Sequence, residues 1–442
     1  MLIDHLISDI DRLPDHYLHG RITGVLGMMA EIGGVQRALS VGDRVAIYSR
    51  NDRKIPAEVV GFRAERALVM PYGTLDGVGL GCRAEVAQTQ PVIYPDASWL
   101  GRVIGPLGEA ADDKGPLLNG ERSYPIRNQP PAAHRRQRVA GKLDIGVRSI
   151  NTFLTCCRGQ RMGIFAGSGI GKSVLLSMIA RYTSADVTVI GLVGERGREV
   201  QEFIQDDLGP EGLKRSVVVV ATSDQPPLLR RQSALLTLTI AEYFRDQGKN
   251  VLCLIDSVTR FAMAQREIGL SVGEPPASKG YTPTVFAELP KLLERAGPGA
   301  AGQGSITGLF TVLVEGDDMN EPVADAVRGI LDGHIVLDRA IAERGRYPAV
   351  NVLRSISRTM PGCNTDSENV VVNRARQLIA AYEDMGEMIR LGAYRPGSDP
   401  RTDEAIQYYP SLEQFLTQGK VEPATLESGY AQLSQILGMA PA

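Results

Sequence analysis

The sequence predicts three structured domains: a small β-barrel, a central doubly wound α/β domain and a C-terminal helical domain. Short apolar runs separated by Gly, Asp and Asn turn signals indicate the barrel over residues 21–93. Continuous β-branched runs that alternate with helical patterns indicate buried parallel strands within residues 94–365. Only helical patterns remain over residues 366–442.

Composition excludes several classes of protein. Hydrophobic residues make up 43% of the 442-residue chain, which is enough for substantial cores and excludes a disordered chain. The formal net charge of −3 argues against binding nucleic acid through bulk positive charge. The five cysteines are odd in number and irregularly spaced, so we expect reduced cytosolic thiols rather than disulfides or a zinc site. No apolar stretch approaches the roughly 18 residues of a membrane span.

Residues 1–20 are predicted to form an amphipathic N-terminal helix. Apolar side chains recur there at helical spacing, namely Leu2, Ile3, Leu6, Ile7, Ile10 and Leu13. This segment holds aspartates and a single arginine, Arg12, and its charge of −3 equals that of the whole chain. An acidic amphipathic end favours a protein partner over an anionic membrane, and packing on its own domain explains the pattern equally well.

The remaining elements follow in chain order. Barrel strands are expected at residues 21–26, 44–48, 57–62 and 67–70, which suits a closed barrel of five or six strands. Residues 94–150 form a Gly- and Pro-rich connection, whose Arg135, Arg136 and Arg138 indicate a solvated loop or a subunit contact because no aromatic residue interleaves them. Central strands are expected at residues 162–165, 187–193, 217–220, 251–255 and 309–314. Helices are expected after Pro227, over residues 373–391, and around Leu412 and Leu416.

The most informative motif lies within residues 162–176. An apolar strand leads into a glycine-rich turn, and Gly171, Lys172 and Ser173 then open an apolar helix, which is the context of a P-loop. Such a loop turns its backbone N–H groups toward phosphate oxygens at a helix N-terminus. Lys172 is expected to reach the β and γ phosphates of ATP, and the Ser173 hydroxyl to ligate Mg²⁺. The predicted nucleotide contacts are Gly167, Ser168, Gly169, Ile170, Gly171, Lys172, Ser173 and Val174.

Two carboxylates follow central strands. Asp256 ends the apolar run 251–255 and is predicted to hold the Mg²⁺ shell, with capping of the next helix as a second role. Glu195 follows the run 187–193, at the carboxyl end of a strand where open α/β sheets place their sites, and is predicted to orient the attacking water. The motif's first glycine is Ala166 here, which costs little if its φ stays negative.

These motifs resemble the hexameric rotary-type ATPases, which include the catalytic subunit of ATP synthase and the ATPases of type III protein export. The matching segments are residues 166–173, 194–199, 256–262, 347–350 and 355–358. Within the family, the chain resembles the flagellum-specific export ATPases through residues 315–320, 332–337, 355–361 and 392–399. The resemblance covers nearly the whole chain and implies a RecA-like P-loop domain between the barrel and the helical domain.

The resemblance also implies roles for individual residues. Glu195 matches the family's catalytic glutamate, Arg196 an arginine near the phosphates, and Arg260 an arginine that braces the catalytic site. Tyr347 matches the tyrosine that stacks on adenine, and Phe415 aligns loosely with a second adenine contact. Arg358 matches the arginine finger that completes a neighbour's site, so a homohexamer of this single chain is sufficient for catalysis.

Partners are implied by the resemblance as well. A stator-like regulatory protein is expected at the N-terminal helix, and a coiled-coil stalk protein, export chaperones and substrates at the C-terminal domain. Residues 271–283 are expected to line the centre of the ring. The ATPase would be cytoplasmic and peripherally associated with the export gate at the inner membrane, with no specific nucleic acid bound.

Four other functions stay open on the sequence. They are the ATPase of a non-flagellar type III secretion system, a catalytic subunit in the heteromeric ring of a rotary ATP synthase, a ring-shaped nucleic-acid motor similar to the transcription terminator Rho, and a nucleotide-binding regulator without turnover. The last requires Glu195 and Arg358 to be structural. The barrel lacks the interleaved aromatic and basic residues that stack bases, which disfavours the nucleic-acid motor.

Overall fold

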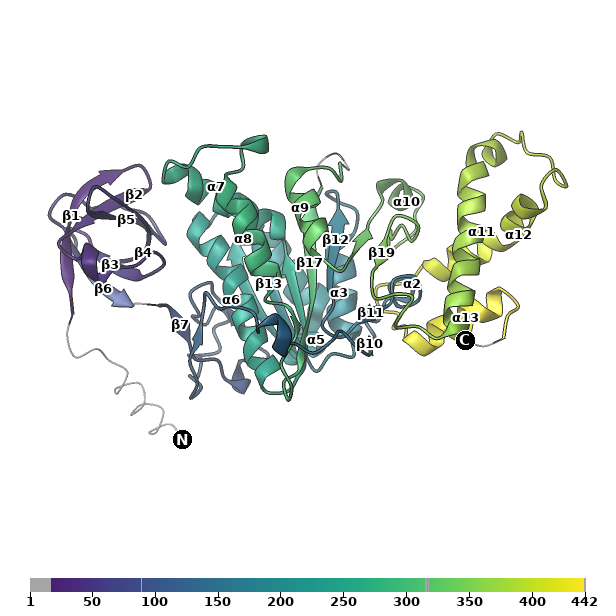
Figure 1. The fold of residues 1–442 in the computed structure, drawn as a ribbon, viewed down its shortest axis with the longest axis horizontal. Coiled ribbons are helices and arrows are strands. Elements are labelled where there is room, and N and C mark those ends of the chain that lie inside the picture. Colours follow the sequence, from purple (N-terminus) through teal and green to yellow (C-terminus); the bar gives the residue numbers. More distant parts are fainter. Residues whose placement is uncertain (1–16, 89, 315, 317, 441–442) are drawn as a thin grey trace.

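The computed structural model describes residues 17–88, 90–314, 316 and 318–440. The barrel, the α/β domain and the helical domain follow one another along the long axis of the molecule (Figure 1), which confirms the predicted fold class. Residues 1–16 of the predicted N-terminal helix lie outside the described residues, as do residues 315 and 317 of the segment 315–320. His19 and Gly20, which the sequence analysis assigned to that helix, belong to the first barrel strand.

Six antiparallel strands close the N-terminal barrel in the order β1-β2-β5-β4-β3-β6. They are β1 (His19–Leu26), β2 (Met29–Gly33), β3 (Arg44–Tyr48), β4 (Lys54–Arg63), β5 (Arg66–Pro71) and β6 (Arg83–Gln88). The four expected runs lie in β1, β3, β4 and β5. The strands β2 and β6 are additional to the expected runs and bring the barrel to six strands.

A largely parallel sheet forms the central domain, in the order β19-β18-β12-β17-β15-β13-β14-β8. The strands are β8 (Val103–Ile104), β12 (Arg161–Ala166), β13 (Val187–Glu195), β14 (Ser216–Thr222), β15 (Asn250–Asp256), β17 (Ser305–Leu313), β18 (Gly333–Val336) and β19 (Ile356–Ser357). β19 pairs antiparallel with β18, and β16 (Gly297–Pro298) pairs antiparallel with β17. All five predicted central runs coincide with strands of this sheet, with Val314 one residue past the end of β17, whereas the short strands β8, β18 and β19 were not predicted.

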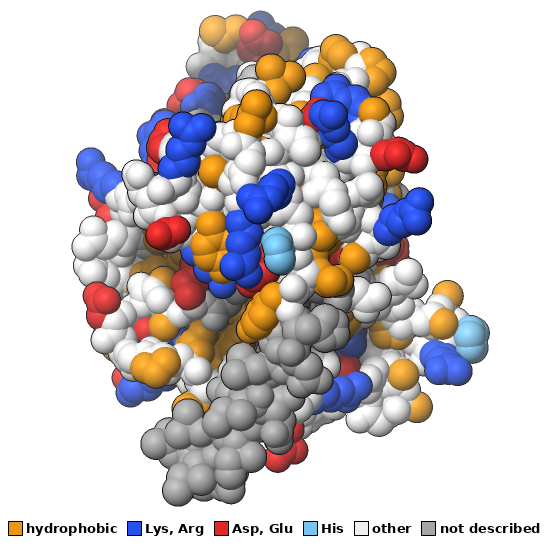
Figure 2. Space-filling view, turned by 90° about the vertical axis from the view of Figure 1, so that its left-hand side faces the viewer, with side chains coloured by type: hydrophobic (Ala, Val, Ile, Leu, Met, Phe, Trp, Pro, Cys, Tyr) orange, Lys and Arg blue, Asp and Glu red, His pale blue; other side chains and the backbone are white. Residues whose placement is uncertain are grey.

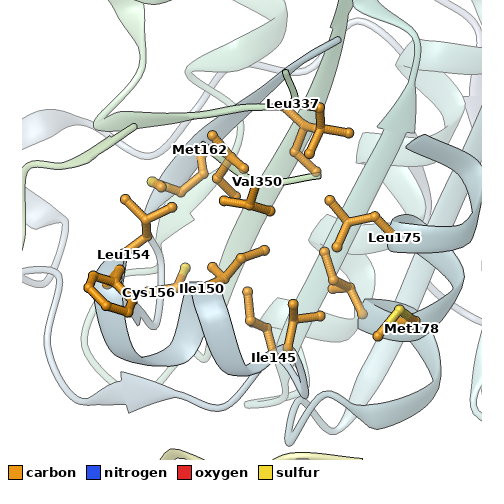
Figure 3. Close-up of a cluster of buried hydrophobic side chains, with 14 of the residues drawn as sticks. Ile145, Ile150, Leu154, Cys156, Met162, Leu175, Met178, Leu337 and Val350 are labelled. Carbon is orange, nitrogen blue, oxygen red and sulfur yellow. The ribbon is translucent and has the colours of Figure 1, made fainter. Parts of the chain in front are cut away.

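Helices cover both faces of the sheet because its strands are apolar on both sides. Leu252 and Leu254 of β15 face one core, and Val251 and Ile255 face the other. The first face is covered by α2 (Arg148–Phe153), α3 (Lys172–Tyr182), α4 (Gly197–Glu202), the π-helix Phe203–Leu208, α5 (Gly209–Lys214) and α10 (Arg339–Glu343). The second is covered by α6 (Pro227–Asp246), α7 (Val258–Ser271), α8 (Pro283–Leu293) and α9 (Pro322–Ile330). Figure 3 shows part of the first core, where α2 and α3 meet β12.

The C-terminal domain consists of α11 (Asp366–Arg390), α12 (Pro400–Leu416) and α13 (Leu426–Ile436). α11 begins before the expected residue 373 because Thr365 and Glu368 form a capping box at its start. Arg148 of α2 fixes this domain to the core, since its guanidinium donates to the carbonyls of Phe415 (3.1 Å) and Thr417 (3.2 Å). Within the described residues, no helix is both long and apolar enough to cross a membrane.

The connection over residues 94–150 corrects one expectation. Arg136 was assigned to a solvated loop or a subunit contact, but it is mostly buried within this chain. Its guanidinium donates to the carbonyls of Pro131 (2.9 Å) and Glu294 (2.7 Å) and pairs with the Glu294 carboxylate (3.2 Å). Arg135 and Arg138 are exposed.

A buried ion pair joins the barrel to the central domain. Glu58 of β4 accepts from Arg231 of α6 (2.6 Å), from Arg127 (2.7 Å) and from the Tyr72 hydroxyl (2.8 Å). Burial opposes the charge of Glu58, but the two guanidinium groups outweigh burial and lower its pKa below the ordinary value. The contact therefore depends on an ionised Glu58 that faces the buried Arg231.

Replacing Glu58 by Gln should destabilise the protein, because it leaves the buried Arg231 charge uncompensated. We expect a loss of about 3–5 kcal/mol in the free energy of unfolding, measured by urea denaturation. Glu31→Gln is the matched control, because Glu31 pairs with the exposed Arg63 and Arg66 on the barrel surface, where ion pairs contribute about 0–1 kcal/mol. Equal losses for both variants would contradict a structural role for the junction.

Candidate functional site

The predicted P-loop joins β12 to α3. Ala166 is the last residue of β12 and pairs with Leu313 of β17, so its backbone is extended and a β-carbon is accommodated there. Gly169 and Gly171 have φ of 76° and 85°, in the left-handed region that favours glycine. Lys172 is the first residue of α3. The loop therefore has the backbone that a phosphate-binding turn before a helix requires.

Three strands bring a cation and two carboxylates together beside this loop. The Lys172 ammonium pairs with the carboxylate of Asp256, at the end of β15, and lies 3.7 Å from the carboxylate of Glu195, at the end of β13. The Thr311 hydroxyl of β17 also donates to Asp256 (2.7 Å). Burial opposes the charge of Lys172, but the neighbouring carboxylates raise its pKa above the ordinary value.

Asp256 does not cap the following helix, which corrects the second role expected for it. The cap of α7 is Ser257, whose side chain accepts from the backbone N–H of Arg260 (3.3 Å). Asp256 is therefore not the helix cap. Its carboxylate instead accepts hydrogen bonds from the Lys172 ammonium and the Thr311 hydroxyl.

Glu195 has the electrostatic properties of a general base. Burial, followed by repulsion from Asp256, raises its pKa to about 7, while Lys172 acts in the opposite direction. Its Oε1 atom is buried and accepts no hydrogen bond from the described residues. A carboxylate whose pKa lies near neutrality and whose oxygen lacks a donor can accept a proton from bound water.

These groups surround a cleft of about 770 Å³. Ten of the predicted site residues line it, namely Gly167, Ser168, Gly169, Gly171, Lys172, Ser173, Val174, Glu195, Arg196 and Arg260. Ile170 is buried and is not among the described residues that line the cleft. Asp256 is buried beside Lys172. The cleft lies at the carboxyl ends of β12, β15 and β13, where open parallel sheets bind ligands.

The two predicted active-site arginines differ in exposure. The Arg196 side chain is 78% exposed and pairs with Glu199 of α4 (3.5 Å). Arg260 is partly buried in α7, and its Nε atom is buried without a hydrogen-bond acceptor among the described residues. Both face the cleft, so both can approach an anionic ligand.

The two aromatic residues proposed to contact adenine, Tyr347 and Phe415, also differ in exposure. A β-carbon on Gly171 would lie 3.3 Å from the Tyr347 ring, so this ring packs directly against the P-loop, and the residue is 46% exposed. Phe415 is only 1% exposed, with its ring centroid 6.3 Å from that of Phe153. The suggestion that Phe415 contacts adenine is wrong, because its ring is enclosed in the core between α2 and α12.

Arg358 lies apart from these residues. It follows β19 at the edge of the sheet, is exposed, and is absent from the residues that line the cleft in the described part of the chain. Its backbone N–H donates to the carbonyl of Asp332 (2.9 Å), which fixes its position at that edge.

Sequence reasoning missed several residues that line the cleft. They are Glu199, Thr259, Met263, Arg266, Lys279, Tyr281, Glu321 and Arg339. Glu199 and Thr259 fall inside motifs that the sequence analysis had identified, so position within a motif was a usable signal. Arg339 donates to the carbonyl of Ser168 (3.2 Å) from α10, a contact that no sequence spacing indicates.

Two family models match the chain. Residues 146–357 match the nucleotide-binding domain of the ATP synthase alpha/beta family, and residues 365–435 match the C-terminal domain of the type III secretion ATPase EscN. Together they cover the central and helical domains described above.

Individual relatives match over almost the whole chain. The flagellum-specific ATP synthase of Caulobacter vibrioides is 57% identical, covering 98% of each chain, and that of Bacillus subtilis is 51% identical, covering 99% of each. The assembled ATPase EscN of enteropathogenic E. coli type III secretion superposes with a TM-score of 0.86 at 38% identity, covering 95% of this chain and 100% of that one. This chain therefore belongs to the ATP synthase alpha/beta family, and within it to the flagellum-specific ATP synthases.

Proposed function

We propose that this protein hydrolyses Mg-ATP to energise flagellar type III protein export, as a homohexameric ring whose sites are shared between subunits. One observation carries the proposal. Lys172 and Glu195 line one cleft, with Asp256 buried beside Lys172, while Arg358 is not among the described residues that line the cleft of its own chain. We infer that a neighbouring copy of the chain supplies its Arg358 guanidinium to this cleft.

The predicted site residues have separate tasks in the proposed hydrolysis. Backbone N–H groups of the P-loop bind the phosphates, and Lys172 moves from its carboxylate partners toward the β and γ phosphates. Glu195 holds the attacking water and accepts its proton, for which its raised pKa prepares it. Arg196 and Arg260 balance the negative charge, and Tyr347 provides a ring surface for adenine beside Gly171.

The oxygen atoms of Ser173 and Asp256 are suitable ligands for Mg²⁺. Ser173 offers a hydroxyl at the start of α3, and Asp256 a buried carboxylate at the end of β15. Oxygen donors of this kind, completed by phosphate and water, are the set that Mg²⁺ prefers. Bound there, the ion would neutralise charge on the β and γ phosphates.

Partners outside the ring follow from the relatives. EscN has been solved in complex with its central stalk EscO, and we assign an equivalent stalk protein to this chain's helical domain. The same proposal includes a stator-like regulator at the N-terminal segment, chaperones and substrates at the helical domain, and attachment to the export gate at the membrane.

The surface of the barrel end does not resemble a nucleic-acid-binding surface. Acidic, basic and hydrophobic side chains are interspersed on it (Figure 2), whereas nucleic-acid binding requires a basic patch or stripe.

A flagellar role is favoured over a non-flagellar type III role. The flagellum-specific relatives reach 57% identity over the chain, whereas the secretion ATPase EscN reaches 38%. Loss of motility on deletion of the gene, with secretion of non-flagellar cargo intact, is the expected result. Normal motility would contradict the flagellar assignment.

Glu195→Gln should bind ATP and hydrolyse it about 10²–10⁴-fold more slowly, because the amide cannot accept the proton of water. Nucleotide affinity is measured with a fluorescent ATP analogue and turnover by phosphate release. Lys172→Ala is the contrasting control, since it should weaken nucleotide binding itself. Turnover by Glu195→Gln at the parental rate would remove Glu195 from the mechanism.

The pH dependence of the parental enzyme should report Glu195. The carboxylate is the active form, so kcat/KM should fall as pH decreases through about 7, where burial has raised the pKa. In Glu195→Gln this acidic limb should disappear. A parental profile that stays flat down to pH 5 would contradict the assignment.

Arg358→Ala should retain nucleotide binding and lose about 10³–10⁵-fold in turnover. Mixing Arg358→Ala with Lys172→Ala protein should restore part of the activity, because a mixed ring contains sites with an intact P-loop and an intact neighbouring Arg358. The control is each variant alone at the same total concentration. No recovery at any ratio, in samples shown to contain mixed rings, would refute the shared site.

A further inference from the structure

The tyrosine proposed to stack on adenine is attached to the helical domain through its backbone. Tyr347 follows α10 in the chain and is 46% exposed, with its ring packed beside Gly171 of the P-loop. Its carbonyl accepts a hydrogen bond from the backbone N–H of Gln418 (2.9 Å), which lies two residues after the end of α12. The ring is therefore accessible to a ligand, whereas the backbone of the same residue is fixed from another domain.

Gln418 is itself held firmly in place. Its side-chain oxygen accepts from the backbone N–H of Arg148 at the start of α2 (2.7 Å). Its side-chain amide donates to the carbonyls of Gly146 (2.9 Å) and Glu422 (2.7 Å). The residue is only 4% exposed, so these bonds are shielded from water and restrict it to one position. Gln418 consequently fixes the Tyr347 carbonyl relative to the central domain.

The residue before Tyr347 makes a second contact with the helical domain. Arg346 is 7% exposed, and its guanidinium lies 3.5 Å from the Glu413 carboxylate of α12 and donates to the carbonyl of Val350 (3.1 Å). The Tyr409 hydroxyl, also from α12, donates to the other Glu413 oxygen (2.9 Å) and so orients that carboxylate. Because a buried guanidinium is costly unless it is paired, the position of Arg346 depends on Glu413.

The surroundings leave these polar contacts with most of the work of holding the turn. A cavity of about 220 Å³ lies between α10 and the helices α11 and α12, and Ile341, Arg344, Tyr382 and Tyr409 are among its lining residues. Apolar packing therefore does not fill this side of the turn. The Nη1 atom of Arg346 is buried without a hydrogen-bond acceptor among the described residues, so Glu413 is its compensating charge.

We propose that Arg346 and Gln418 are positioning residues that hold the Tyr347 ring beside the P-loop, so that affinity for the adenine base depends on the helical domain. Arg346 fixes the backbone before the Tyr347 α-carbon, and Gln418 fixes it after that atom. Neither residue is among the described residues that line the cleft, so both act through Tyr347. The proposal rests on the proposed function in taking an adenine nucleotide as the ligand of this cleft.

The two parts of the nucleotide should respond differently to loss of these contacts. A ring that is already held in place loses little conformational freedom when a base stacks on it, whereas a ring on a loose turn must be ordered during binding. The phosphates are bound by the P-loop between β12 and α3, which does not depend on Arg346. Loss of Arg346 should therefore weaken binding of the base and leave binding of the phosphates unchanged.

Calorimetric titration of the full-length chain with Mg-ADP and with Mg-pyrophosphate tests the proposal. Neither measurement requires turnover, and pyrophosphate has phosphates but no base. Tyr347→Ala sets the scale, with ADP binding weakened about 5–150-fold, because stacking of a base on an aromatic ring has this value. Arg346→Ala and Gln418→Ala should each weaken ADP binding several-fold, up to that limit, with pyrophosphate affinity unchanged.

A double variant shows whether Arg346 acts through the tyrosine. Arg346→Ala combined with Tyr347→Ala should bind ADP as Tyr347→Ala alone does, because the ring that Arg346 positions is already absent. Arg344→Ala is the matched control, since this arginine belongs to the same turn but is exposed, and its loss should leave both affinities unchanged. If Arg346→Ala protein does not fold, Glu413→Gln breaks the same pair from a partly exposed side chain and takes its place in the cycle.

The possible failures are distinguishable. Equal weakening of ADP and pyrophosphate binding, additive losses in the double variant, or parental ADP affinity in both Arg346→Ala and Gln418→Ala would overturn the positioning role. Protein that shows the expected affinities but never hydrolyses ATP would refute the proposed function and leave the positioning role in place. A parental chain that binds neither ADP nor pyrophosphate would refute the nucleotide site, and the positioning role with it.

Discussion

One buried cation between two carboxylates is the interaction on which the site depends. Lys172 reaches Asp256 and Glu195 only because β12, β15 and β13 lie in register on either side of β17, with Leu192 of β13 opposite Asp256 of β15. Buried charges are costly unless they are paired, so the cluster is stable while its members compensate one another. In the proposed mechanism, ATP phosphates would attract Lys172, and the two carboxylates would then become available to water and Mg²⁺. The same arrangement would stabilise the folded site and prepare it for the proposed catalysis.

Two different polar contacts attach the outer domains to the central domain. Glu58 and Arg231 join the barrel to α6 through a buried ion pair, and Arg148 joins the helical domain through backbone carbonyls. Neither attachment involves the edge strand β19. Arg358 consequently stays exposed at the edge of the sheet, which is where a residue must lie if it serves a neighbouring copy.

Sequence predicted the domains and the P-loop because both depend on local patterns. β-branched runs marked the buried strands, and the motif fixed Lys172 and Ser173 by spacing alone. Sequence could not predict contacts that arise from packing. Arg339 reaches Ser168 from a separate helix, Ser257 rather than Asp256 caps α7, and the ring of Phe415 is enclosed in the core.

The proposed shared site makes catalysis a property of neighbouring subunits, so the ATPase rate measured against protein concentration tests it most directly. Specific activity, measured alongside light scattering over a dilution series, should rise cooperatively and follow the fraction of protein in rings. A specific activity that stays constant down to concentrations at which the protein is monomeric would contradict the account, because a single chain would then hold every catalytic group.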